Sequence, residues 1–135
     1  MPKLRFEPAP DAFFIAKDII EKLEWDHIDL TRVRFVRSKG AKTNAVARIW
    51  GLSRVFQEAF DIQPLYVIEL TERFYKLPRE EQEKTIIHEL MHIPKNFSGA
   101  LLPHKQFGKW KITERQVKSI HRKYKSSTAD MYPSI

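Results

Sequence analysis

The sequence predicts a single domain of the α+β class, in which a small sheet of about three strands or more packs against helices. Strand patterns occur in three segments, residues 31–36, 45–51 and 65–70. Apolar residues recur at helical spacing in four others, residues 11–25, 52–60, 78–92 and 114–125. A chain of 135 residues is long enough for one core and too short for two independent ones. We therefore expect one domain over residues 1–125 and a flexible tail over residues 126–135.

The first half of the chain predicts one helix and two strands. Asp11 can cap a helix that runs toward Trp25. Residues 31–36 alternate apolar with basic side chains, which is the period of a half-buried strand. The next strand, over residues 45–51, carries Trp50, and we expect this tryptophan to be packed rather than to line a groove.

The middle of the chain adds a short helix and a buried strand. Residues 52–60 place apolar side chains at helical intervals. Residues 65–70 are nearly continuously apolar, so this strand is expected to be covered on both faces. Further on, Thr113 and Gln116 have the spacing of a capping box at the start of a basic helix over residues 114–125.

The most informative stretch is a His-Glu-x-x-His sequence formed by His88, Glu89 and His92. Residues four apart lie on one helix face, so the two histidines can direct their imidazoles at one metal ion. Glu89 lies about 100° further round the helix, where a carboxylate can take a proton from a metal-activated water. The competing interpretation is an ordinary amphipathic helix with two histidines facing solvent.

The rest of this helix favours the metal site. Its apolar residues cluster on the arc opposite the histidines: Ile86, Ile87, Leu90, Met91 and Ile93. One face can therefore pack while the other lines a cleft. Pro78 suits a helix start, and the acidic residues after it interact favourably with the positive end of the helix dipole. Pro94 disfavours helical geometry at the residue before it, so the helix should end within a residue or two of His92.

Composition excludes several classes of protein. The absence of cysteine excludes disulfides and thiolate metal sites, so a metal would be held by histidines and carboxylates. The N-terminus has no apolar signal-peptide core, and no stretch is apolar enough to span a membrane. We therefore expect a cytoplasmic protein that does not act in a membrane.

The net charge of +7 is concentrated in two basic segments, residues 31–48 and 105–125. Such segments can contact nucleic acid or an acidic partner, although a solvated basic surface explains them as well because no nucleic-acid-binding module accompanies them. The candidate contact residues are Arg32, Arg34, Arg37, Lys109, Lys111, Lys118 and Arg122.

A catalytic zinc site usually has three protein ligands, so a third is needed. His104 is the leading candidate, because it lies in the loop that must turn back under the helix after Pro94. Two alternatives stay open. Glu114 would complete a two-histidine, one-glutamate set, and His121 lies on the apolar side of the last predicted helix.

One run of motifs resembles the zinc metallopeptidase family found in phages and archaea and, more distantly, the SprT-like metallopeptidases. The resemblance covers about residues 45–108 and rests on His-Glu-Leu-Met-His-Ile-Pro, followed by Phe-Ser-Gly and then Pro-His. It implies a minimal zincin-like domain, in which a small twisted sheet packs on an active-site helix and further helices. It also implies that His88, His92 and His104 hold Zn²⁺ and that Glu89 is the general base.

The sequence thus predicts a zinc-dependent metallopeptidase that hydrolyses peptide bonds in a peptide or protein substrate. The main alternative is a basic nucleic-acid-binding protein whose zinc site is structural or vestigial. The two interpretations are compatible, since a peptidase that acts on nucleoprotein would need both features. A peptidase that acts on one dedicated partner is the remaining possibility.

Overall fold

The computed structural model describes residues 3–104 and 112–131, with side chains described as far as Ser127. Within these residues a four-stranded mixed sheet has the strand order β1-β2-β4-β3. The outer strands are β1 (Arg5–Pro8), antiparallel to β2 (Val33–Lys39), and β3 (Ala47–Gly51), antiparallel to β4 (Tyr66–Leu70). The central pair, β2 and β4, is parallel. The fold is of the α+β class, as predicted.

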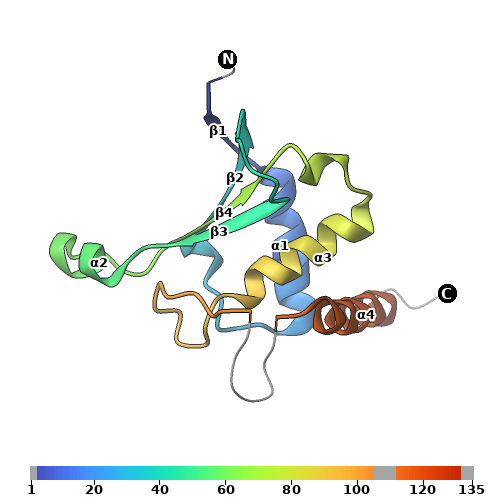
Figure 1. Cartoon of the computed structure of the whole chain (residues 1–135). Coiled ribbons are helices and arrows are strands. Elements are labelled where there is room, and N and C mark those ends of the chain that lie inside the picture. Colours follow the sequence, from blue (N-terminus) through green and yellow to red (C-terminus); the bar gives the residue numbers. More distant parts are fainter. Residues whose placement is uncertain (1–2, 105–111, 132–135) are drawn as a thin grey trace.

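Three of the four helices gather on one side of the sheet (Figure 1). Helix α1 (Pro10–Leu23) packs on β2, and α3 (Arg79–Met91) packs beside β3. Helix α4 (Glu114–Met131) covers α1 and α3. The short helix α2 (Arg54–Phe60) lies within the connection from β3 to β4 and stands apart from the other helices. No helix in the described ranges is long and apolar enough to cross a membrane.

The core lies between the sheet and these three helices. Successive strand residues point to opposite faces, so Tyr66, Ile68 and Leu70 of β4 all enter the core and are fully buried. Helix α3 supplies the apolar arc that its sequence predicted, and Ile86 and Leu90 are also inaccessible to solvent. Burying each such side chain stabilises the fold by about 1.5–3 kcal/mol. The active face of α3 is therefore held by a firmly packed opposite face.

Strand β1 was not predicted, because its four residues are mostly exposed and show no apolar alternation. It forms by pairing with the end of β2, from Val36 to Lys39. This pairing also explains why β2 continues beyond the predicted end at residue 36. Both features depend on a partner that is distant along the chain.

The expectation of a packed Trp50 is wrong, because its side chain is 53% exposed. Trp50 lies on an edge strand, on the sheet face that carries no helix. Its indole N–H donates to Glu69 Oε1 at 3.1 Å, and Arg48 donates to the same carboxylate. Side chains of the neighbouring edge strand thus cover Glu69, rather than a second layer of helices.

Helix α4 continues through Met131 instead of ending near Lys125. Part of the tail predicted to be flexible is therefore helical, and within that tail the described residues end at Met131. Neither glycine nor proline interrupts residues 126–131, and the first proline is Pro133. The predicted cap is present at the other end, where Thr113 Oγ1 accepts from the Gln116 N–H at 3.2 Å.

A buried carboxylate joins α3 to α4. Glu83 is 3% exposed and accepts from His121 Nε2 at 2.9 Å, with Lys125 at 3.0 Å and Arg79 at 3.2 Å. Burial alone would raise the pKa of Glu83, but these partners outweigh burial and lower the pKa. His121, a candidate metal ligand in the sequence, is thus engaged in holding α4.

Replacing this carboxylate should loosen α4. We expect Glu83→Ala to lower the free energy of unfolding at pH 7 by about 2–4 kcal/mol, because the buried His121 loses its acceptor and two further donors lose a charged partner. A carboxyl group whose pKa is lower in the folded state stabilises the fold at pH values above its unfolded-state pKa. This stabilisation is lost as the pH falls through the folded-state pKa. Urea unfolding of parent and variant should therefore differ most at neutral pH, and the difference should shrink progressively as the pH falls below about 4.5. The exposed change Glu80→Ala is the control, and an equal difference at both pH values would contradict the interpretation.

Candidate metal centre

Helix α3 carries the first two histidines of the site. Its last residue is Met91, and His92 is the capping residue, as expected from Pro94. The rings of His88 and His92 lie on one side of the helix, with centroids 5.2 Å apart. Their positions follow from the helical spacing and from the burial of the opposite apolar face.

The loop after α3 brings His104 to the same point. Its Nε2 lies 3.1 Å from His88 Nε2, and its ring centroid is 4.7 Å from that of His92. One nitrogen from each of the three histidines lies within 4.8 Å of the others. Nitrogens bound to one zinc ion at about 2.0–2.1 Å would be separated by roughly 3.3 Å in a tetrahedral site. The three side chains are therefore close to the spacing that a metal ion requires.

The orientation of His92 is set by a backbone carbonyl. His92 Nδ1 lies 2.5 Å from the Leu102 oxygen, and a carbonyl can only accept, so Nδ1 carries the proton. Nε2 is then left with a free lone pair. Histidines that bind metal commonly donate their other ring N–H in this way. The Leu102 N–H donates in return to the His92 carbonyl at 2.8 Å, which ties the loop to the end of α3.

The other end of this loop is fastened to β4 and α2. The buried Tyr66 hydroxyl accepts from the Gly99 N–H and donates to the Ala100 carbonyl, both at 2.8 Å. Gln57 Nε2 donates to the Ser98 carbonyl at 2.9 Å. A Cβ at Gly51 would lie 2.0 Å from the Gly99 oxygen, so only glycine allows the loop to approach β3 this closely. Sequence reasoning missed these supports, although the Phe-Ser-Gly motif marked the segment.

Loss of the Tyr66 hydroxyl should displace His104. We expect Tyr66→Phe to weaken zinc binding roughly tenfold or more, in the range seen when the hydrogen-bonded support of a ligand is removed. A competition titration with a chelating dye measures this affinity. The control is Tyr75→Phe, whose hydroxyl bonds to Asp11 and not to the loop. Unchanged zinc affinity in a folded Tyr66→Phe protein would show that the hydroxyl does not position His104.

Both α3 histidines are held in the neutral form that binds metal. Burial, together with the nearby His92 and His104, lowers the pKa of His88 to about 4. Burial also lowers the pKa of His92. At neutral pH their nitrogens are consequently available as ligands without loss of a proton.

Glu89 is buried beside this cluster, with 7% of its surface exposed. Burial raises the pKa of its carboxyl to about 7. This value suits proton transfer at neutral pH, because a general base works best when its pKa is near the operating pH. No ion-pair or side-chain hydrogen-bond partner of Glu89 is seen in the described part of the chain, so the carboxylate is not committed to a structural role.

His88 and Glu89 line a cleft of about 520 Å³ between α3, β3 and α4. Its other walls are mainly apolar, with Val46, Leu77 and Val117 among them. Glu114, the alternative third ligand, also lines the cleft but lies outside the histidine cluster and pairs with Lys118 at 3.3 Å. The structure thus brings His104 to the site and leaves Glu114 at its rim.

The candidate partner-binding residues that the structure describes lie in two groups. Lys118 and Arg122 lie on α4, whereas Arg32, Arg34 and Arg37 lie at or near β2, on a separate part of the molecule (Figure 1). The β2 group is partly engaged, since Arg32 donates to the Pro64 carbonyl at 2.8 Å and Arg37 lies 4.0 Å from the Tyr75 ring centroid. Lys109 and Lys111 lie outside the described residues.

A small mixed sheet over a helix that bears His-Glu-x-x-His, with a third histidine returned by a loop, defines a zincin-like α+β domain. Residues 4–134 match the family model described as "Putative phage metallopeptidase", and the chain belongs to this family. The match extends over nearly the whole chain, beyond the stretch that carries the motifs. Comparison with curated proteins and with solved structures found no match.

Proposed function

We propose that the protein is a zinc-dependent metallopeptidase whose ligands are His88, His92 and His104. The observation that carries this proposal is the convergence of three histidine nitrogens within 4.8 Å beside a buried glutamate and a cleft. The family to which the chain belongs supports a metal-dependent hydrolase. Zinc bound to these nitrogens would polarise the scissile carbonyl and make a water molecule acidic.

In this proposal Glu89 moves the proton. Its carboxylate removes a proton from the attacking water and delivers it to the leaving amine, so one group serves as base and then as acid. Burial raises the pKa of Glu89 to about 7 before metal binds, so the carboxylate is a stronger base than an exposed glutamate. His92 contributes by orientation, because its bond to the Leu102 carbonyl directs the other ring nitrogen toward the cluster.

Strand β3 offers the substrate a place to bind. It is an edge strand beside the cleft. At its two ends, the Val46 carbonyl accepts from the Thr71 N–H and the Leu52 N–H donates to the Leu65 carbonyl, so these backbone groups point toward β4. Because such groups alternate along a strand, the backbone groups of Ala47, Ile49 and Gly51 face the open edge. An extended peptide can pair there as an added strand. The apolar walls of the cleft favour substrates with an apolar side chain near the scissile bond.

Digestion of a peptide library tests the proposal. Zinc-loaded protein should produce new peptide termini that mass spectrometry detects, with apolar residues enriched next to the cut. Cleavage should stop with 1,10-phenanthroline and return when zinc is added. Glu89→Gln protein purified in parallel controls for contaminating proteases. If the zinc-loaded parent and this variant yield the same products, the peptidase assignment fails.

Nucleic-acid binding is the second candidate function, and no observation favours it over the peptidase. The candidate contact residues that the structure describes stand in two separate groups, on α4 and around β2. Binding that depends on several phosphate contacts would weaken steeply with added salt. A fluorescence anisotropy titration with single- and double-stranded DNA at low and moderate salt measures this, and absence of binding at low salt would exclude the function.

A further inference from the structure

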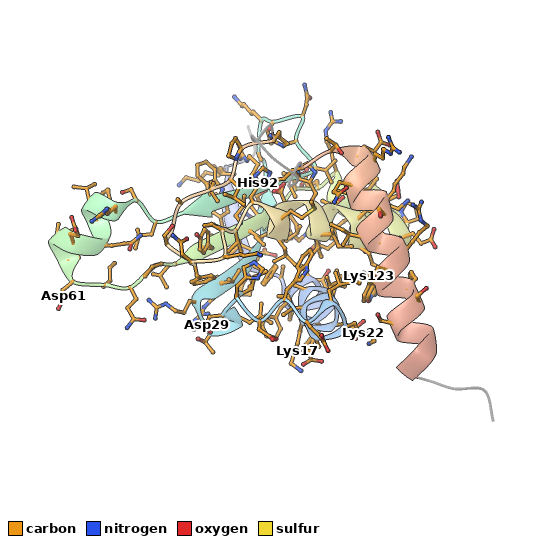
Figure 2. The ribbon with its side chains drawn as sticks, turned by 90° about the horizontal axis from the view of Figure 1, so that it is seen from below. Lys17, Lys22, Asp29, Asp61, His92 and Lys123 are labelled. Carbon is orange, nitrogen blue, oxygen red and sulfur yellow. The ribbon has the colours of Figure 1, made fainter. Side chains whose placement is uncertain are left out.

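Helix α2 and the turn after it expose an unusual amount of apolar surface. We call this surface the apolar projection; its members are Val55, Phe56, Phe60, Ile62 and Leu65, which are 39% to 68% exposed. No residue of α2 is buried. Figure 1 shows α2 standing away from the body of the molecule, and Figure 2 shows Asp61 at its outer end. Exposed apolar side chains gathered on one short element in this way commonly mark a binding surface.

The apolar projection is held in a defined conformation. The Leu52 N–H donates to the Leu65 carbonyl at 2.9 Å, which joins the two ends of the connection between β3 and β4. The Ile62 N–H donates to the Gln57 carbonyl at 3.0 Å and ends the helix. The rings of Phe56 and Phe60 are stacked with centroids 5.9 Å apart. A preformed surface loses little freedom when it binds a partner, which favours a binding role over a purely flexible loop.

The apolar projection is connected to the rim of the metal centre. Gln57 of α2 donates to the Ser98 carbonyl, in the loop that carries His104. Leu101 lies between Ser98 and His104 along this loop, and it is 41% exposed. Leu101 therefore adds one exposed apolar side chain to the loop segment that runs from Ser98, the residue bonded to α2, to His104. Helix α2 and the proposed ligand His104 are thus tied to one loop, which makes a substrate shared by both the simplest occupant.

Charge and size restrict the occupant. The charged residues of α2 and its end are Arg54, Glu58 and Asp61, and the first two pair with each other at 3.4 Å. This surface has no cationic excess to attract nucleic acid or anionic lipid. A helix of seven residues is about 10 Å long, so it cannot supply the roughly 800 Å² per partner of a typical stable complex by itself. Its occupant must be held at a second place as well.

We propose that the apolar projection is an exosite that binds an apolar segment of the protein substrate outside the cleft. This rests on the proposed peptidase function, which supplies the second point of attachment. Binding at one point raises the effective concentration of the substrate at the other, so a small surface can contribute strongly. Protein substrates with an apolar segment beyond the cut are then preferred over short peptides.

The double variant Phe56→Ala/Phe60→Ala tests the exosite. Both rings are exposed, so the fold should be retained, which circular dichroism confirms. With β-casein as an unfolded apolar substrate, we expect KM to rise roughly tenfold with little change in kcat. A fluorogenic peptide spanning one mapped casein cut should be hydrolysed as by the parent. The matched control is Arg54→Ala on the same helix. An unchanged KM for casein would overturn the proposal.

A binding measurement separates this inference from the peptidase assignment. Zinc-loaded Glu89→Gln protein should bind fluorescein-labelled casein, and adding the two alanine changes should weaken binding by a similar factor. That result would establish binding of an apolar protein segment at the apolar projection even where the parent cleaves no substrate, an outcome that removes the proposed function and leaves the binding surface in place. A dimer by light scattering that dissociates in the double variant would assign the surface to a second copy of the chain. Binding of the parent to phosphatidylcholine vesicles, lost in the double variant, would assign it to a membrane; either result overturns the exosite.

Discussion

Glu89→Gln is expected to retain zinc and to lose peptide hydrolysis by roughly 10²–10⁴-fold, the usual contribution of a general base. Glutamine has nearly the same shape but does not accept a proton at neutral pH. The residue lies beside the histidine cluster without belonging to it, so metal binding should persist. Paired measurements of bound zinc and of kcat/KM on one peptide test both parts of this expectation.

The pH dependence of the parent gives an independent check. Burial raises the pKa of Glu89 to about 7 in the protein without metal, and the charge of a nearby zinc ion would lower it. Only the carboxylate is a base, so kcat/KM should fall on the acid side of a midpoint at or below pH 7, about tenfold per pH unit. The residual activity of Glu89→Gln should lack this acid limb. An unchanged limb, or full activity in the variant, would remove Glu89 from its role.

His92→Ala and His104→Ala are each expected to abolish stoichiometric zinc binding. The parent should bind about one equivalent, and loss of one of three ligands should weaken affinity by more than the roughly 10–100-fold that follows loss of a ligand's hydrogen-bond partner. Elemental analysis of dialysed proteins, followed by competition with a chelating dye, measures stoichiometry and affinity. Peptide hydrolysis should be lost in parallel.

Glu80→Ala provides the control, because Glu80 is exposed and lies outside the cluster of three histidines. It should bind zinc as the parent does. Retention of zinc by His104→Ala, with loss in His92→Ala, would show that the third ligand lies elsewhere, and Glu114 at the rim of the cleft is the next residue to replace. A parent that takes up no zinc would contradict the metallopeptidase assignment.

Local spacing in the sequence determined the helix of the metal centre. A separation of four residues places His88 and His92 on one face whatever the rest of the fold is, and Pro94 ends the helix by its own geometry. The strands β2 and β3 were likewise predictable, because a period of two survives in their sequences, and β4 was predictable from its nearly continuous apolar run. Local spacing could not place His104. Its approach to the helix was inferred from the turn of the loop after Pro94 and from the family pattern.

Contacts between distant segments decided the remainder. Strand β1 exists through its pairing with β2, and Trp50 is exposed because its strand became an edge. Tyr66 looked like an ordinary strand residue, yet its hydroxyl fastens the loop that carries His104. The apolar period of α2 predicted its helix but not its exposure, because a period shows which residues share a face and not whether another element covers that face. The sequence therefore determined the local geometry of the site, and the tertiary structure decided which distant groups support, complete and surround it.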